Sequence, residues 1–160
     1  AAAVIVGKEI GTGNLKGVYN IGRALCFTAF AFGIVLGVAE YTMFVTLMRP
    51  FVMPLFSLSA VAERLCSVML MCYACAIPLH SFSTTMVVGV LRGGGDGVVP
   101  AAITMVFTCI VRLIYLWGYA FSHNSNLTIA VIYPISWVLT SIAFLLYYKS
   151  RKWMPKGFHF

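Results

Sequence analysis

Long apolar runs separated by short polar segments make up most of this chain. The runs cover residues 24–48, 65–91, 97–122 and 127–148. Each is longer than the roughly 20 residues that an α-helix needs to cross a bilayer at a rise of about 1.5 Å per residue. None shows the alternation of apolar and polar positions that is typical of strands in a membrane barrel. The pattern therefore predicts an all-α membrane protein with four transmembrane helices, because helices satisfy their backbone hydrogen bonds internally, as lipid requires.

The composition also favours a membrane protein. Hydrophobic residues make up 61% of the 160 residues and charged residues 9%, whereas soluble domains contain about 25% charged residues. The chain begins with apolar residues 1–6 and has no initial Met. Because this run is too short to cross a bilayer, we expect it to be the end of a fifth helix, and the chain to be a fragment of a longer protein.

Basic residues lie mainly on one side of the predicted helices. That side holds Lys8, Lys16, Arg23, Arg92, Lys149, Arg151, Lys152 and Lys156, and the other side holds Arg49 and Arg64. The positive-inside rule predicts that the richer side, with the C-terminus, is cytoplasmic. Lys16 and Asp96 should then face the cytoplasm, and Ser59 and Asn124 the outside. We expect this topology in a bacterial inner membrane.

Aromatic residues flank the predicted spans. Trp153, Tyr147 and Tyr148 should mark the inner interface of the membrane, and Trp117 and Tyr119 the outer one. The asymmetry of the basic residues accounts for the net charge of +7. The chain has no basic stripe of the kind that binds nucleic acid, so we expect no such partner.

Residues that could carry out chemistry are few and scattered. The acidic residues are far apart in sequence, and the same holds for the histidines. Neither a nucleophile–base pair nor a metal cluster can be assembled from them, so we expect neither an enzyme nor a bound metal or other cofactor. Cys72 and Cys75 have a metal-like spacing, but no second pair follows at zinc distance, and cysteines in apolar spans are typically structural.

Two charges lie inside predicted spans. Glu40 and Arg112 are about 12 Å and about 15 Å from the outer ends of their helices at 1.5 Å per residue. An unpaired charge in lipid costs at least ~2.5 kcal/mol. Their similar depth and opposite charge suggest either an ion pair or a shared water-filled cavity. The alternative is that one or both reach the interface along extended side chains.

A glycine-rich turn joins the second and third predicted spans. Its residues are Arg92, Gly93, Gly94, Gly95 and Asp96. Glycine can end a helix with a positive φ. Asp96 can cap the next helix, with Pro100 in its first turn, where no backbone N–H is needed. The turn does not follow a strand, so a phosphate-binding loop is not indicated.

Several motifs resemble the multidrug and toxic compound extrusion (MATE) family. Gly89-Val90-Leu91-Arg92-Gly93-Gly94-Gly95-Asp96 looks like a cytoplasmic-loop motif of that family. Val6-Gly7-Lys8-Glu9-Ile10-Gly11-Thr12-Gly13-Asn14 resembles its turn after the second helix of a lobe. Tyr133-Pro134-Ile135-Ser136-Trp137 and the closing Tyr147-Tyr148 with Lys152-Trp153 resemble the end of its second lobe. The resemblance implies two six-helix lobes, of which residues 1–160 would be the C-terminal part of the second.

This resemblance implies a function in export. MATE transporters expel amphipathic, often cationic, organic compounds in exchange for Na⁺ or H⁺, by rocking two lobes around a central cavity. The partners would be the missing N-terminal lobe, the lipid bilayer and small organic cations. Aromatic and methionine side chains suit such a cavity. The candidates are Tyr73, Phe82, Met86, Tyr115, Tyr133 and Trp137, although each could equally pack against another helix or face lipid.

One stretch departs from the family pattern. Some sodium-coupled members carry an acidic residue in the helix that ends in the Arg-Gly motif, but residues 80–85 contain no carboxylate. We therefore expect the main coupling carboxylate in the absent first lobe. Two alternative functions remain open: a flippase for lipid-linked oligosaccharides, in which Arg112 and His80 could hold a phosphate, and a membrane scaffold without transport.

Overall fold

The computed structural model describes residues 1–120 and 126–154 of the chain. Within these ranges all regular structure is helical, and four helices are long and apolar enough to cross a membrane. Short helix α1 (Ala2–Gly11) turns back into α2 (Leu15–Met43), which continues through π-helical η1 (Phe44–Val52) and 3-10 helical η2 (Met53–Phe56). The predicted all-helical class is confirmed for the described residues, and so is the presence of four helices long and apolar enough to cross a membrane, with a short helix before them.

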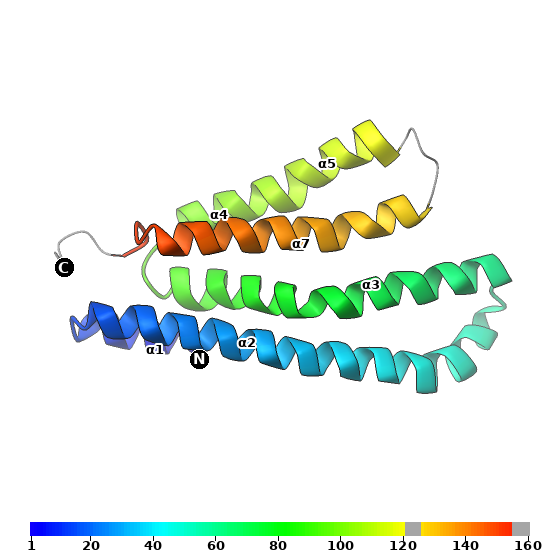
Figure 1. The fold of residues 1–160 in the computed structure, drawn as a ribbon, viewed down its shortest axis with the longest axis horizontal. Helices are drawn as coiled ribbons and strands as arrows, with labels where there is room; N and C mark the ends of the chain where they lie inside the picture. Colours follow the sequence, from blue (N-terminus) through cyan, green and yellow to red (C-terminus); the bar gives the residue numbers. More distant parts are fainter. Residues whose placement is uncertain (121–125, 155–160) are drawn as a thin grey trace.

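The remaining helices are also composite. Helix α3 (Ala60–Thr84) continues as π-helical η3 (Thr85–Leu91). After the glycine-rich turn, α4 (Val98–Met105), η4 (Val106–Ile110), α5 (Val111–Tyr115) and η5 (Leu116–Ala120) follow one another without a break. Helix α7 (Asn126–Lys149) is the last element. Figure 1 shows these four long rods side by side, in the order α2, α3, α7 and α4–α5.

Local sequence signals set several helix ends. Asn14 accepts a hydrogen bond from the N–H of Gly17, and Ser59 accepts one from the N–H of Ala62, as N-caps do. Gly13, with φ +76°, makes the turn between α1 and α2. These signals start α2 and α3 earlier than the predicted spans at residues 24 and 65, because a helix extends past the apolar run into polar sequence until a cap stops it.

The first span is also longer at its other end than the sequence pattern predicted. The candidate span covers Lys16–Phe56, so the helix does not stop at residue 48. Pro50 lies inside η1, where the wider π-helical winding accommodates the missing backbone donor. Helices α3 and α7 likewise continue through Pro78 and Pro134.

Close packing between α2 and α3 depends on two glycines. A Cβ atom at Gly33 would lie 2.6 Å from the Cα of Pro78, and one at Gly37 would lie 2.5 Å from the carbonyl oxygen of Ala74. Gly33 and Gly37 thus form a small-residue face at the interface between the two helices. Because Pro78 has no N–H, the Ala74 carbonyl lacks its usual helical donor, and Gly37 leaves room for it to approach the neighbouring backbone.

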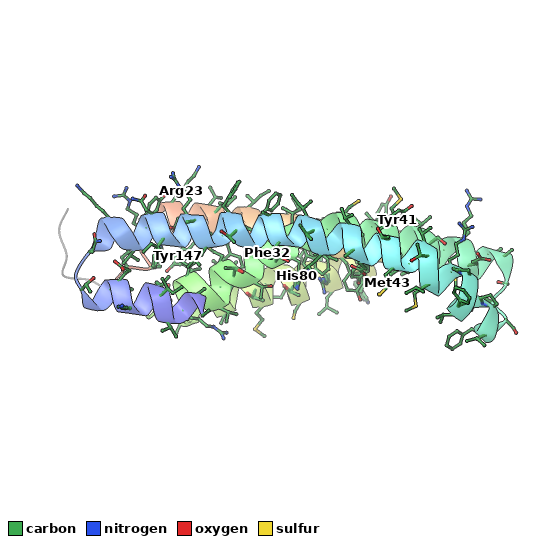
Figure 2. The ribbon with its side chains drawn as sticks, turned by 90° about the horizontal axis from the view of Figure 1, so that it is seen from below. Arg23, Phe32, Tyr41, Met43, His80 and Tyr147 are labelled. Atoms are coloured by element: carbon green, nitrogen blue, oxygen red, sulfur yellow. The ribbon has the colours of Figure 1, made fainter. Side chains whose placement is uncertain are left out.

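The largest buried cluster lies at one end of the bundle. It contains Val6, Val18, Cys26, Met86, Val90, Leu91, Phe144, Tyr148, Trp153 and Met154. Elsewhere many large apolar side chains stay exposed, including Phe32, Leu55 and Trp117. Figure 2 shows the side chains that project along α2, with Phe32 and Met43 labelled. An outward apolar surface of this kind is what a lipid environment stabilises.

The same end of the bundle collects most of the positive charge, and we call it the basic end. It carries Lys8, Lys16, Arg23, Arg92, Lys149, Arg151 and Lys152, whereas Arg49 and Arg64 lie at the opposite end. Lys156 and Asn124, which the topology prediction also used, lie outside the described residues. Trp153 and Tyr148 differ from the interface anchors expected, because they are only 2% and 4% exposed. Their rings stack on each other, and Trp153 also lies against Gly94 while Tyr148 stacks on Tyr19.

Candidate functional site

Three helices bring aromatic and basic side chains together in one group, which we call the Arg112 cluster. Its members are Tyr73 and His80 from α3, Arg112 from α5, and Tyr133, Ser136 and Trp137 from α7. The α3 pair is two turns apart and the α7 trio is spaced by one turn or less. Each set therefore lies on one side of its helix.

The rings of the cluster contact one another directly. Tyr73 lies 5.5 Å from Tyr133 and 5.5 Å from Trp137, centroid to centroid, with the Trp137 ring nearly perpendicular at 81°. His80 lies 4.6 Å from Trp137 on the side toward the basic end. Such offset and edge-to-face pairs stabilise a cluster beyond the area that they bury. The result is a continuous aromatic surface between α3 and α7.

Arg112 is held by α7 and not by an acidic partner. Its Nε and Nη2 donate to the Oγ of Ser136 at 2.9 Å and 2.8 Å, and its guanidinium lies 4.4 Å from the centre of the Tyr133 ring. Ser136 in turn donates to the carbonyl of Tyr133 at 2.8 Å. A cation–π contact and two hydrogen bonds thus offset part of the cost of a charge at this depth.

The ion pair between Glu40 and Arg112, one of the alternatives that the sequence left open, is not formed among the described residues. Among residues 1–120 and 126–154 the salt bridge present is Arg49–Glu63, at 3.3 Å and exposed. Helix α2, which carries Glu40, is separated from α5 by α3 and α7 (Figure 1). Similar depth in the membrane says nothing about which helices are neighbours, so it could not identify the partner.

The structure divides the six predicted cavity residues among three places. Tyr73, Tyr133 and Trp137 belong to the Arg112 cluster. Tyr115 instead contacts Tyr119 in the same continuous helical segment, with 5.4 Å between the ring centroids. The remaining two, Phe82 and Met86, lie apart from the Arg112 cluster and line a pocket between α2, α3 and α7.

A pocket of about 490 Å³ extends from the Arg112 cluster toward the basic end. We call it the hydroxyl pocket, because five of its lining residues carry hydroxyl groups. Its lining includes His80, Ser83, Thr84, Arg92, Thr104, Thr108, Trp137, Thr140 and Phe144. Its volume falls within the range typical of small-molecule sites.

Three hydroxyls of this pocket donate to carbonyl groups of their own helices. Thr84 donates to the carbonyl of His80, Thr104 to Pro100 and Thr140 to Ser136. Their oxygen lone pairs remain able to accept hydrogen bonds. Sequence reasoning missed Thr104 and Thr140, because a hydroxyl that bonds to its own helix is ordinary in an apolar span.

Serine side chains join α3 to α7 beside the hydroxyl pocket. The Oγ atoms of Ser83 and Ser141 are 2.6 Å apart, and both residues are buried. One hydroxyl donates to the other across this contact. The hydroxyl that accepts can donate its own proton along its helix, to the carbonyl of Leu79 from Ser83 or to that of Trp137 from Ser141. The stretch without a carboxylate, residues 80–85, therefore includes a helix contact made by hydroxyl groups.

The glycine-rich turn begins at Arg92, at the basic end of the hydroxyl pocket. Asp96 accepts a hydrogen bond from the N–H of Val99 at 3.3 Å, and Gly95 has φ +91°. The predicted cap and the predicted left-handed glycine are both confirmed. The other carboxylate oxygen of Asp96 accepts a hydrogen bond from the hydroxyl of Tyr147, which the sequence did not indicate. Arg92 is exposed and lines the pocket.

Within the described ranges, no group of three or more His, Cys, Asp and Glu side chains is arranged to hold a metal ion. Comparisons with protein-family models, curated proteins and solved structures found no match to this chain. The Arg112 cluster and the hydroxyl pocket therefore have to be interpreted from their own chemistry.

Proposed function

We propose that this chain is the C-terminal part of the second lobe of a MATE-type transporter with twelve helices. In this proposal it is a cation-coupled antiporter, not an enzyme, and it exports amphipathic or cationic organic compounds from a bacterial cell. The motifs around Gly89–Asp96 and Tyr133–Trp137 support the family, and the four apolar helices are compatible with it. The observation that carries the function is the hydroxyl pocket, with the aromatic Arg112 cluster at one end.

The chemistry of this pocket suits weakly selective binding. Ring faces attract flat or cationic organic compounds, and hydroxyl oxygens can accept hydrogen bonds from different directions. Arg112 already lies over Tyr133, so a cationic substrate would bind at the Trp137 ring, which lines the hydroxyl pocket. Neutral amphipathic compounds would not be repelled by Arg112 and could use all three rings.

The proposed coupling ion, Na⁺ or H⁺, needs a charged or titratable group in the membrane. The hydroxyl pocket contains no carboxylate among its lining residues. Glu40 lies in α2, away from that pocket. We therefore place the main coupling carboxylate in the first lobe of the full-length protein. The discriminating measurement is ion-dependent efflux: Glu40→Gln should leave the ion dependence intact, and replacement of one first-lobe acid should abolish it.

Transport itself is tested with substitutions in the Arg112 cluster. In cells that express the full-length protein, Trp137→Leu and Tyr73→Leu should each reduce efflux of aromatic cations several-fold, because each removes a ring face. Trp117→Leu is the matched control, since Trp117 is 82% exposed and lies outside the cluster. Equal efflux by all three variants at equal expression would contradict the proposed site. No drug efflux by the wild-type protein would instead favour a membrane scaffold without transport.

A flippase for lipid-linked oligosaccharides is the second candidate. The observation that favours it is the position of Arg112 and His80, which lie on either side of the Tyr133 and Trp137 rings. Two basic groups in one cluster could hold a phosphate. Arg112→Gln separates the candidates: it should abolish translocation of a phosphorylated lipid, whereas export of organic cations should persist.

A further inference from the structure

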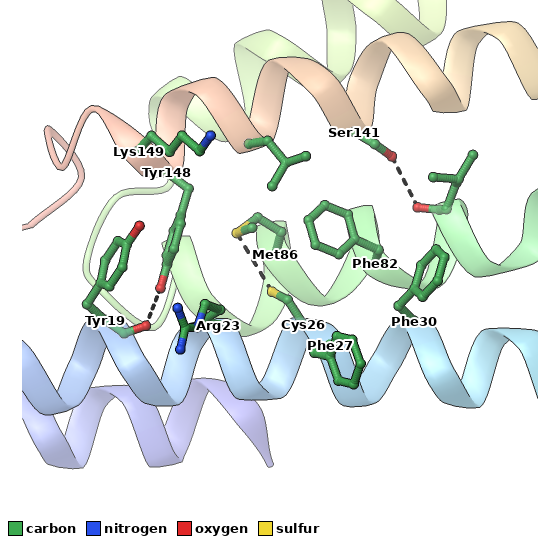
Figure 3. Close-up of a pocket in the computed structure, with 12 residues that line it drawn as sticks. Tyr19, Arg23, Cys26, Phe27, Phe30, Phe82, Met86, Ser141, Tyr148 and Lys149 are labelled. Atoms are coloured by element: carbon green, nitrogen blue, oxygen red, sulfur yellow. Dashed lines mark hydrogen bonds between the residues drawn. The ribbon is translucent and has the colours of Figure 1, made fainter.

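A second pocket opens on the opposite side of α3 from the hydroxyl pocket, and we call it the lateral pocket. It has a volume of about 410 Å³ and lies between α2, α3 and α7 at the basic end. Figure 3 shows Arg23 and Lys149 beside Tyr148 at one end of it, and Phe27, Phe30 and Phe82 farther along. Charge and apolar surface are thus separated along its length.

The apolar part of the lateral pocket faces the surroundings of the bundle. Phe27 and Leu145 line it and are 73% and 42% exposed. Its floor is buried, because Met86 is 1% exposed and its sulfur lies 3.8 Å from that of Cys26. An apolar groove that is open sideways in a membrane-spanning bundle meets acyl chains and not water.

The basic side chains that line the lateral pocket are not neutralised by acidic residues in its lining. Arg23 and Lys149 line it, and no Asp or Glu does. An adjoining pocket shares Tyr19 and adds a further basic residue, Lys16. In the described ranges the salt bridge present is Arg49–Glu63 at the opposite end, so neither Arg23 nor Lys149 is paired with a carboxylate there.

We propose that the lateral pocket binds one anionic glycerophospholipid. Its phosphate lies between Arg23 and Lys149, and an acyl chain follows Phe27, Phe30 and Phe82 away from the basic end. Basic pockets between transmembrane helices are suited to anionic headgroups, and each Lys or Arg near the surface strengthens the attraction. The inference requires that the four helices lie in a membrane, but not that the protein transports anything.

A bound lipid at this position would contact three helices that are distant in sequence. Tyr148 already connects two of them, α7 and α2: its hydroxyl donates to the carbonyl of Tyr19 at 2.5 Å, and the centroids of the two rings are 4.7 Å apart. The phosphate would lie beside this contact. Since anything that binds the folded state stabilises it, anionic lipid should raise the melting temperature of the protein more than zwitterionic lipid does.

The test is native mass spectrometry of the full protein from micelles that contain equal amounts of phosphatidylglycerol and phosphatidylcholine. We expect one retained phosphatidylglycerol. The double substitution Arg23→Gln with Lys149→Gln should weaken its retention roughly ten- to thirty-fold, because it removes the attraction of two basic side chains for the phosphate. Lys8→Gln with Lys152→Gln removes the same charge from the same end but from neither pocket, and should retain the lipid. Arg23→Lys with Lys149→Arg should also retain it.

A second pair of variants tests the acyl-chain part of the lateral pocket. Leu145→Glu places a carboxylate in the pocket, whereas Leu146 is 65% exposed and does not line it. Leu145→Glu should lose the lipid and Leu146→Glu should keep it, at the same cost of placing a charge in the membrane. Equal retention of both phospholipids, or equal losses in either matched pair, would overturn the proposal. Competition by glycerol 3-phosphate as strong as by the lipid would also overturn it, because the site would then bind only the anion.

Discussion

Asp96 uses its two carboxylate oxygens for two different elements. One accepts the N–H of Val99 and caps α4, and the other accepts the hydroxyl of Tyr147 on α7. The cap is local, within three residues, and follows from residue type. The contact with Tyr147 connects the glycine-rich turn to the last helix. It therefore also connects the basic end of the hydroxyl pocket to the helix that carries Trp137.

Tyr147→Phe should destabilise the fold by about 1.5–3 kcal/mol, because it removes a hydrogen bond to a charged acceptor. The free energy of unfolding, measured by titration with a denaturing detergent, checks this. Tyr41→Phe is the matched control: it removes a hydroxyl from a ring that is 44% exposed on α2. The same loss for both variants would show that the bond with Asp96 contributes nothing.

Arg112 is stabilised by its neighbours on α7 and not by Glu40. A double-mutant cycle of Arg112→Gln with Ser136→Ala should therefore show a coupling energy of about 0.5–3 kcal/mol in folding. A cycle of Arg112→Gln with Glu40→Gln should be additive within about 0.5 kcal/mol, as expected for residues without shared partners. If the second cycle were coupled and the first additive, the contacts assigned to Arg112 would be wrong.

Helices α2 and α3 approach closely because of glycine on one and proline on the other. Pro78 removes the donor for the Ala74 carbonyl, and that carbonyl faces Gly37, where no side chain stands in the way. Without a hydrophobic driving force between helices in lipid, close backbone contact of this kind stabilises their association. Gly33 and Gly37 thus allow the backbones of α2 and α3 to pack closely together.

Gly37→Ala should cost about 1–3 kcal/mol, because its Cβ would lie 2.5 Å from a backbone oxygen, which cannot move aside as a flexible side chain could. Gly11→Ala is the control, since Gly11 is also helical and a Cβ there meets nothing within 4 Å among the described residues. Melting temperatures in detergent should fall for the first variant only. An unchanged melting temperature for Gly37→Ala would mean that α2 and α3 are not in close contact.

The whole bundle separates charge along its length. Basic residues concentrate at the end that holds the glycine-rich turn and residues 149–152, and Arg49 and Arg64 lie at the other. The positive-inside rule, applied to this separation, predicts that the basic end is cytoplasmic. Both proposed sites, the hydroxyl pocket and the lateral pocket, reach the basic end.

The orientation can be tested by labelling single cysteines in a background without the five native cysteines. Lys16→Cys and Gly97→Cys should react with an impermeant reagent only after the cells are opened, because we place the basic end in the cytoplasm. Ser59→Cys should react in intact cells. Labelling of position 97 from outside would reverse the topology, although not the fold.

The features that could be predicted from the sequence alone depend on residues that are close to one another along the chain. The number of spans follows from the length of each apolar run, and the charged end follows from counting basic residues near each run. The cap at Asp96 and the left-handed Gly95 depend on atoms only a few residues apart. None of these needs knowledge of which helices are neighbours.

Which helix faces meet is decided only in the tertiary structure. Apolar residues surround each span, so the sequence pattern does not say which face packs and which meets lipid. For this reason Glu40 and Arg112 looked like partners, and Phe82 and Met86 looked like neighbours of Trp137. Close contacts between particular residues determine the arrangement instead, such as Gly37 against Ala74 and Ser83 against Ser141. In the resulting arrangement Arg112 lies beside Tyr133, and Arg23 and Lys149 line an open pocket.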